Sequence, residues 1–358
     1  MVKVIEENNV DTIKIKVVGV GNAGGNIVSK ICDKMEGIEF IIFNTDAQAL
    51  KFSKADIKIQ IGEKTTQGRG TGSDPEKGKF AANEDREKIA ETLRGSQLIF
   101  MTMGLGGGTG TGSSPIIAKI AKDVGAVVIA LAITPFSFEG KKREEQARKG
   151  LESLEKNVDT LIHIPNERLR EIVDQQTTMI DAFKKVDEII ARGISSITDL
   201  IYRPRVLIPI DFADICSIIE NSGRGILGLG HGKGEGKIQE AAHSAVDYPL
   251  LVKEEIMEAQ KILISIVGSP DLSLTEIYEA MEIIEERIPS ISRKLGVTVN
   301  ENLKSEVQIT LLATGIGKQK IKAKEIPVGS KDETQLPLEE IDIPPSLRGK
   351  KRGKMEEL

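Results

Sequence analysis

A run of small residues from Gly106 to Gly112, reading GGGTGTG, constrains the fold more than any other stretch of the chain. It follows the apolar segment 97–103 and precedes an amphipathic segment at 115–124, the pattern of a strand, a loop and a helix. Such glycine density weakens helices and strands alike, so an ordinary structural role explains it poorly. Successive small residues can instead present N–H groups to phosphate oxygens, with the hydroxyls of Thr109 and Thr111 beside them. We therefore expect a phosphate-binding loop here.

Two further glycine-rich stretches point to the same kind of site. Residues 19–24 (GVGNAG) fit G-x-G-x-x-G directly after an expected strand at 13–18, and Asp46 follows about 20 residues later, as in dinucleotide-binding folds. Residues 68–72 (GRGTG) could close over the same site from their own loop. Three such loops suit a triphosphate better than a dinucleotide, and the Walker A motif is absent from the sequence. We expect a nucleotide site of another design, with a Rossmann oxidoreductase as the weaker alternative.

The pattern of apolar residues predicts two kinds of fold joined by a long helix. Strands and helices alternate over 13–164, which is typical of a parallel sheet covered on both faces. Apolar residues then recur every three or four positions over 179–202, as in one long helix, and Pro204 ends it. A mixed pattern follows, with expected helices at 237–246 and 273–287 and expected strands at 205–210, 261–267, 296–300 and 306–314.

The expected fold class is therefore α/β, a Rossmann-like nucleotide-binding domain joined by the central helix to a smaller α+β domain. Residues 62–78 are expected as a loop, 79–94 as one helix, and 222–236 as a stretch of small residues with no assigned strand. The expected divisions of the chain are an N-terminal extension at 1–12, the nucleotide-binding domain at 13–178, the central helix at 179–204, the α+β domain at 205–316, a linker at 317–340 and a tail at 341–358.

Composition excludes several classes of protein. A net charge of −5 argues against a nucleic-acid-binding protein that relies on overall basicity. The three His residues form no cluster in the sequence. Cys32 and Cys216 are expected as two separate buried thiols in a reducing compartment, so we expect no metal site. Residues 1–12 lack the apolar core of a secretion signal, and no apolar run reaches the roughly 18 residues of a membrane span. These features predict a cytosolic protein.

Several motifs in this order resemble those of FtsZ, the bacterial tubulin-like cell-division GTPase. They are GVGNAGGN at 19–26, NTD at 44–46, GGGTGTG at 106–112, TPFSFEG at 134–140, DFAD at 211–214 and PDLSLTE at 270–276. The resemblance covers roughly residues 13–316, with a short DIPPSLR echo at 342–348. It implies the tubulin/FtsZ GTPase fold, GTP or GDP as the nucleotide, and Mg²⁺ or K⁺ as candidate companions of the nucleotide.

The resemblance also implies a role for particular residues. Asp187 would accept the N–H donors of guanine, Phe183 would stack on the base, and Glu139 and Arg143 would contact sugar or phosphate. Without the resemblance, Phe183 and Asp187 would be taken as an ordinary core residue and a solvated charge, although their spacing of four places both on one helical face. The residues expected at the phosphates are Asn22, Ala23, Gly24, Gly25, Asn26, Gly107, Gly108, Thr109 and Gly110.

Catalysis in this family is shared between subunits. The loop at 206–214 would enter the nucleotide site of the next subunit, where Asp211 and Asp214 would orient and activate water. Asp214 alone could equally be a carboxylate that stabilises a helix N-terminus. The family usually has Asn-x-Asp-x-x-Asp here, whereas this chain has Pro209, which offers neither a side-chain amide nor a backbone N–H. The alternative function is thus a filament scaffold that binds GTP and hydrolyses it slowly.

The partners that the resemblance implies are other copies of the chain and division proteins. The subunits would assemble head to tail into filaments of the division ring in the cytoplasm, beneath the membrane. The segment 341–354 would bind membrane-tethering and regulatory division proteins, so contact with the membrane would be indirect. The basic residues in this segment are equally typical of a solvated tail. No nucleic acid is expected as a partner.

Overall fold

The computed structural model describes residues 13–35, 37–171, 173, 176–202, 206–250, 253–288 and 291–317. The expected N-terminal extension at 1–12, Pro204, the tail and all of the linker except Gly317 lie outside these residues.

The strands of the described residues join in one sheet. They are β1 (Ile15–Val20), β2 (Glu39–Asn44), β3 (Ile57–Gln60), β4 (Leu98–Gly104), β5 (Val127–Thr134), β6 (Thr160–Pro165), β7 (Val206–Ile208), β8 (Gly223–Lys233), β9 (Lys261–Gly268), β10 (Ser292–Val299) and β11 (Glu306–Ile316). Their order is β3-β2-β1-β4-β5-β6-β8-β11-β9-β10-β7. Neighbours are parallel from β3 to β8, whereas β11 is antiparallel to both β8 and β9.

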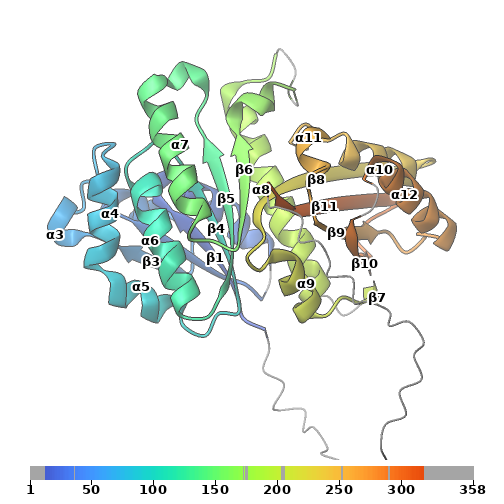
Figure 1. The fold of residues 1–358 in the computed structure, drawn as a ribbon, viewed down its shortest axis with the longest axis horizontal. Coiled ribbons are helices and arrows are strands. Elements are labelled where there is room, and N and C mark those ends of the chain that lie inside the picture. The colour runs from blue at the N-terminus through green and yellow to red at the C-terminus, as the bar shows by residue number, and fades with distance from the viewer. Residues whose placement is uncertain are drawn as a thin grey trace, which may run out of the picture. The chain divides into compact units, whose positions relative to one another are not determined.

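Helices cover this sheet (Figure 1). They are α1 (Gly21–Ile31), α2 (Ala47–Phe52), α3 (Glu63–Thr66), α4 (Pro75–Glu84), α5 (Arg86–Leu93), α6 (Thr109–Asp123), α7 (Lys141–Glu155), α8 (Met179–Tyr202), α9 (Phe212–Ile219), α10 (Lys237–Val246), α11 (Lys253–Ile256) and α12 (Leu274–Arg287), with short 3₁₀ turns at Cys32–Lys34, Ser137–Glu139 and Asn166–Glu171. In the described part of the chain, no helix is both long enough and apolar enough to cross a membrane.

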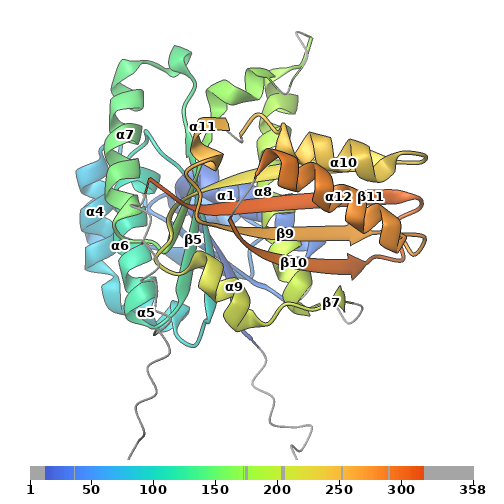
Figure 2. The same cartoon turned by 45° about the vertical axis from the view of Figure 1, so that its right-hand side comes forward.

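Alternation along the strands sets the two layers of helices. On β4, Phe100 packs into the core that contains α1, α8 and α9, and Met101 packs into the opposite core that contains α4, α5, α6 and α7. Both side chains are buried because successive residues of a strand point to opposite faces. A third core lies between the strands β8, β9 and β11 and the helices α10 and α12. Figure 2 shows α10 and α12 lying along those strands.

The long helix predicted at 179–202 is confirmed as α8. Its apolar positions are buried at the expected spacing, among them Val186, Ile190, Ile194 and Ile197. The helix contacts α1 at one part of its length and the strands β8, β9 and β10 at another. The two halves of the sheet are therefore packed against a common helix.

Three expectations about elements were wrong here, and the start of α6, in the glycine run, is a fourth. The stretch 222–236 contains β8, a strand in the middle of the sheet. Glycine is disfavoured in strands, but here α10 lies so close that a Cβ on Gly230 would stand 1.8 Å from the Ala241 carbonyl oxygen. The loop expected at 62–78 contains α3 and the start of α4, whose N-cap Asp74 accepts from the Glu76 N–H. The helix expected at 79–94 is two helices, α4 and α5.

The halves of the sheet are joined by a short stretch of pairing between β6 and β8. Only Thr160 with Gly223, Leu161 with Arg224 and Ile162 with Gly225 are in register among the described residues. The neighbouring pairs, β5 with β6 and β8 with β11, extend over longer stretches. This joint is therefore the narrowest pairing in the middle of the sheet.

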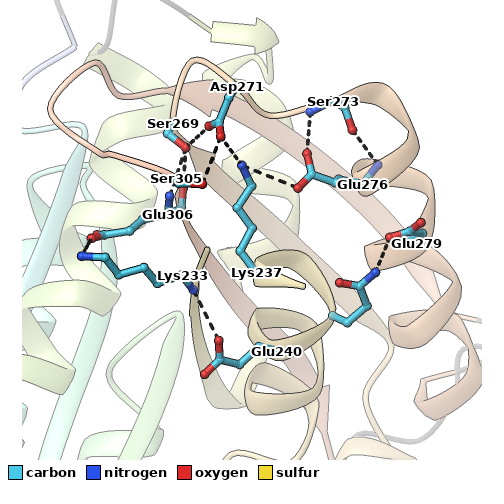
Figure 3. Close-up of polar contacts among 11 residues, drawn as sticks. Lys233, Lys237, Glu240, Ser269, Asp271, Ser273, Glu276, Glu279, Ser305 and Glu306 are labelled. Atoms are coloured by element: carbon cyan, nitrogen blue, oxygen red, sulfur yellow. Dashed lines mark hydrogen bonds and ion pairs between the residues drawn. The ribbon is translucent and has the colours of Figure 1, made fainter. Parts of the chain in front are cut away.

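A buried lysine ties together the loops at the far end of β8, β9 and β11 (Figure 3). The side chain of Lys237 is 5% exposed, and its Nζ lies 2.8 Å from Asp271 and 3.6 Å from Glu276. Asp271 also accepts from Ser269 and Ser305. These partners lower the pKa of Asp271 to about 2, chiefly through the hydrogen bonds from Lys237 and Ser269. A buried ammonium needs such partners, because desolvation of an unpaired charge is costly.

Candidate functional site

A cavity of about 830 Å³ opens at the carboxyl edge of β1, β4 and β5, beside the N-terminal half of α8. The carboxyl ends of parallel strands meet at one edge of a sheet, so the loops after them converge. All of the residues expected to bind nucleotide line this cavity except Gly24 and Gly25. Those two are buried in α1, and a Cβ on Gly24 would stand 2.2 Å from the Thr102 carbonyl oxygen, so close packing on β4 accounts for that glycine.

The glycine run is partly helical, which differs from the loop expected at 106–112. The helix α6 begins at Thr109, with Gly108 as its N-cap, rather than at Pro115. The first N–H groups of a helix have no partner inside it, and the macrodipole adds positive character there. Because Gly107, Gly108, Thr109 and Gly110 all line the cavity, the N-terminus of α6 presents donors suited to phosphate oxygens.

The glycines of the run serve different purposes. A Cβ on Gly108 would stand 2.0 Å from the hydroxyl of Thr71, and one on Gly112 would stand 1.9 Å from the carbonyl oxygen of Pro75. Glycine at these two positions therefore allows α4 and the loop before it to pack directly against the glycine run. A Cβ on Gly107, in contrast, would have no atom within 4 Å. Thr111 is buried, and its hydroxyl accepts from the Gly106 N–H, so it braces the loop and does not line the cavity.

The N-terminus of α1 forms the facing wall. Asn22, Ala23 and Asn26 line the cavity, and the first turn of α1 contains no acidic residue to repel an anion. The amide of Asn44, at the end of β2, donates to Asn22 Oδ1 at 2.8 Å and so fixes that side chain. The hydroxyls of Thr45 and Thr109 lie 2.7 Å apart and join this wall to α6. Two helix N-termini thus converge on one space.

The loop at 68–72 does close over the cavity, as the sequence suggested. Arg69, Gly70, Thr71 and Gly72 line it. Asp46, which the dinucleotide-binding alternative would use as a ribose acceptor, instead caps α2 by accepting from the N–H groups of Gln48 and Ala49. Asp46 also lines the cavity, but its Oδ1 is already engaged in capping α2.

The loop after β5 supplies charged groups. Thr134, Pro135 and Glu139 line the cavity, as does Arg143 from the first turn of α7. Glu139 pairs with Arg143 at 2.5 Å and accepts from the Phe136 N–H at 2.9 Å. Arg143 is thereby held beside the glycine run, where a guanidinium suits phosphate.

One end of the cavity, where the resemblance predicts the guanine base, is lined by α8. Phe183 is 44% exposed and meets Phe136 edge to face, with ring centroids 6.1 Å apart. The Asp187 side chain is only 13% exposed and forms an ion pair with Lys30. Burial raises the pKa of Asp187, and the contact with Lys30 opposes that rise. An exposed ring beside a half-buried carboxylate is an arrangement suited to a purine with N–H donors.

Asn166 is a cavity residue that sequence reasoning missed. It follows β6, it is 4% exposed, and its Oδ1 is buried without a hydrogen-bond partner. A buried unpartnered acceptor costs free energy unless a ligand satisfies it. The signal available was its position directly after an expected strand of the same parallel sheet. Lys30, which lies two turns into α1, carried no comparable signal.

The expected catalytic residues lie elsewhere. Asp211 is the N-cap residue of α9, is exposed and makes no side-chain capping bond. Asp214 lies in the first turn of α9, and its carboxylate pairs with Lys294 at 2.7 Å. Neither lines the nucleotide cavity of its own chain. Both cysteines are free thiols, and Cys216 is buried as expected, whereas the expectation of a buried Cys32 was wrong because that residue is partly exposed in the turn after α1. Over the residues the structure describes, no three His, Cys, Asp or Glu side chains are grouped to hold a metal ion.

Comparisons with known proteins agree with this geometry. Residues 14–174 match the model of the GTPase domain of the Tubulin/FtsZ family, and residues 223–317 match that of the C-terminal domain of the FtsZ family. An empty FtsZ dimer from M. jannaschii is 40% identical with a TM-score of 0.79, over 85% of this chain and 88% of that one. A point mutant of FtsZ from M. jannaschii gives the same identity and TM-score, over 85% of this chain and 92% of that one.

A more distant solved structure shares the fold alone. CetZ2 from Haloferax volcanii, solved as a GTPγS-bound protofilament, is 20% identical with a TM-score of 0.72, over 86% of this chain and 95% of that one. Fold and cavity define a nucleotide-phosphate-binding protein of the α/β class. The chain belongs to the tubulin/FtsZ family of GTPases.

Proposed function

We propose that this chain hydrolyses GTP in head-to-tail filaments of the cell-division ring, with each active site completed by the Asp211 loop of the next subunit. The observation that carries this proposal is that the binding groups and the candidate catalytic carboxylates lie in separate places in one chain. The cavity gathers the donors for phosphate and base, whereas Asp211 and Asp214 stand outside it. A second copy could bring them together, and the FtsZ of M. jannaschii has been solved as a dimer.

The proposed chemistry follows from the groups available. Water attacks the γ-phosphorus, the bond to the β-phosphate oxygen breaks, and GDP and phosphate leave. Charge growing on the phosphate oxygens would be stabilised by the N–H groups at the starts of α1 and α6. A carboxylate of the neighbouring subunit would orient the water and accept its proton. Asp211 is the better candidate, because Asp214 is already paired with Lys294.

The tail and the cations belong to the same proposal. The DIPPSLR motif supports binding of membrane-tethering and regulatory division proteins by residues 341–354, which lie outside the described residues. That binding would place the filaments at the division site. Mg²⁺ or K⁺ would accompany the nucleotide, held chiefly by its phosphates.

A concentration series tests the coupling of turnover to assembly. Phosphate release per subunit should rise steeply above a threshold protein concentration, because each active site needs two subunits. Release that is proportional to protein concentration throughout would contradict the proposal. Filaments with little release at any concentration would favour the second candidate, a slow scaffold, which Pro209 in place of the usual Asn motivates.

A mixing experiment tests whether the site is shared. The Asp211→Ala variant should retain an intact nucleotide cavity but lack the proposed catalytic carboxylate. The Gly108→Ala variant should retain Asp211 but fail to bind nucleotide, because a Cβ at Gly108 would overlap the Thr71 hydroxyl in the cavity wall. Each variant alone should be inactive, with Asp211→Ala still binding GTP. A mixture of the two should regain turnover at mixed interfaces. Glu220→Ala, at the far exposed end of α9, is the control for Asp211→Ala. An inactive mixture that still forms mixed filaments would place Asp211 in its own subunit's site.

A further inference from the structure

A second cavity, of about 350 Å³, lies where β6 meets β8, beside α7 and α11. Its volume is within the range of small-molecule sites. Its lining is mixed, with apolar side chains at Leu161, Ile226 and Leu250 and polar ones at His163, Arg168 and Arg224. Leu161 is in register with Arg224, so apolar and charged groups alternate across the joint. The cavity is therefore amphipathic, with two guanidinium groups among its lining.

The two guanidinium groups differ in their partners. Arg224 is held by the Glu155 carboxylate through two contacts of 3.1 and 3.2 Å, and Glu255 also lines the cavity nearby. Arg168 donates from Nη1 to the Pro249 carbonyl oxygen at 2.7 Å, and no carboxylate of the described residues forms an ion pair with it. A guanidinium has five N–H donors, so Arg168 keeps donors for an additional acceptor.

His163 is the neutral member of the group. Its ring is open to the cavity but surrounded by protein atoms, and that burial, with Arg224 and Arg168 nearby, lowers its pKa to about 4. At neutral pH the ring therefore carries one N–H and one acceptor nitrogen. Nε2 lies 2.9 Å from the hydroxyl of Thr134.

This hydrogen bond joins the two cavities. Thr134 lines the nucleotide cavity and His163 lines the second one. The end of β6 also faces both cavities, because Pro165 lines the second cavity and the next residue, Asn166, lines the nucleotide cavity. A ligand that moves β6 from one cavity would therefore move groups that face the other.

We propose that the second cavity binds a small carboxylate with an apolar body, held by Arg168 and Arg224, and that its occupancy is coupled to nucleotide binding through the bond between His163 and Thr134. The carboxylate would accept from the guanidinium groups, and the apolar body would lie against Leu161, Ile226 and Leu250. Glu155 and Glu255 near Arg224 disfavour a multiply charged anion, which is why a monocarboxylate is the expected class. This site is distinct from the proposed GTPase site.

The binding test uses the full chain with hexanoate as the probe. Hexanoate should shift the NMR signals of the His163 ring, identified by their loss in His163→Gln, and should raise the thermal midpoint. Hexanol and inorganic phosphate, each of which has half of the required chemistry, should bind about tenfold more weakly or worse. Equal effects of hexanoate and hexanol, or of hexanoate and phosphate, would overturn the proposed ligand class.

Matched variants locate the site. Arg168→Gln should weaken hexanoate about tenfold, whereas Arg170→Gln should not, because Arg170 is exposed on the same turn and does not line the cavity. Arg224→Gln serves as a second variant on another strand, in case Arg168→Gln disturbs the contact with Pro249. Undiminished binding by both cavity variants would place hexanoate elsewhere.

Coupling is a separate readout. Hexanoate should change the affinity for GDP, and GDP should change the affinity for hexanoate by the same factor, as linkage requires. The factor is a ratio of affinities within one variant, so it can be compared even where the hexanoate affinity itself changes. His163→Leu should lose most of this factor, whereas His163→Gln, which can still bond to Thr134, should keep more of it. A factor that is the same in His163→Leu and the unmodified chain would overturn the coupling but not the GTPase.

Discussion

Lys30 on α1 and Asp187 on α8 form an ion pair at the base end of the nucleotide cavity. The pair links α1, whose N-terminus lines the cavity, to the long helix between the halves of the sheet. Asp187 is buried more deeply than Lys30, so the lysine compensates part of the desolvation of the carboxylate. A purine bound by Asp187, as proposed, would share this carboxylate with Lys30.

Replacement of this carboxylate should alter nucleotide selection. Asp187→Asn should weaken GTP binding about tenfold or more and weaken ATP binding much less, because an amide has one acceptor oxygen and an NH₂ donor where the carboxylate has two acceptor oxygens and a negative charge. The measurement is the Kd of each nucleotide by competition. Glu188→Gln, the exposed neighbour paired with Lys185, is the control. Equal losses for both nucleotides would remove Asp187 from base recognition.

Two neighbouring glycines should respond differently to one methyl group. Gly108→Ala should destabilise the chain by about 1–3 kcal/mol and abolish nucleotide binding, because the Cβ would overlap the Thr71 hydroxyl and the Asp74 backbone. Gly107→Ala should leave the unfolding free energy unchanged, since its Cβ would meet no atom within 4 Å. Urea unfolding and GTP titration measure both. A similar loss of stability in Gly107→Ala would contradict this account of the run.

Asn166 should matter to the ligand more than to the fold. Asn166→Leu should lower nucleotide affinity while the unfolding free energy of the empty protein stays the same or rises, because its buried Oδ1 has no partner there. Calorimetric GTP binding and urea unfolding of the same samples test this. A large loss of stability with intact binding would make Asn166 purely structural.

Pro209 provides a gain-of-function test. It is exposed immediately before the buried Ile210 at the start of the proposed catalytic loop. Pro209→Asn should raise GTP turnover, because the amide restores a polar group that the proline lacks. Phosphate release is compared at matched filament mass, with Pro270→Asn, in the loop before α12, as the control. Unchanged turnover would make the proline incidental.

The cluster around Lys237 should give a pH-dependent contribution to stability. Asp271 has a folded pKa of about 2, below the ordinary 3.8, so its favourable contribution is full above about pH 4 and is lost as the pH falls toward 2. Urea midpoints of the unmodified chain and Asp271→Asn should therefore differ most above pH 4 and converge near pH 2. If the two urea midpoints still differ at pH 2, the stabilising effect of Asp271 comes from packing and not from its charge.

Much of the nucleotide half could be predicted because its signals are local. The helix α8 carries its apolar spacing in its own sequence, and the glycine runs mark the places where backbone must approach a ligand or another element. The start of α6 could not be predicted from the sequence. Glycine is required at Gly108 and Gly112 because Thr71 and Pro75, from another part of the chain, pack against them.

The second half depended more on tertiary context. The strand β8 contains glycines that usually weaken a strand, and it forms because β11 pairs along its length and α10 needs the space above Gly230 and Gly232. At the site, Lys30 follows the motif at 19–26 and Asn166 follows an expected strand, but neither position shows from sequence that the side chain faces the cavity. Their roles arise only when α1 and β6 are brought to the same edge.

The narrow joint between β6 and β8 has a mechanical consequence. A sheet is stiff in proportion to the hydrogen bonds that resist bending, and here the two halves share only the pairs from Thr160 with Gly223 to Ile162 with Gly225. A force that bends the sheet would therefore act mainly on these three pairs, while the strands on either side, which are paired over longer stretches, would each move as a rigid unit. Any bending between the halves is thus expected along this line of pairs, which ends one residue before His163, and α8, packed on both halves, would have to bend or slide with it.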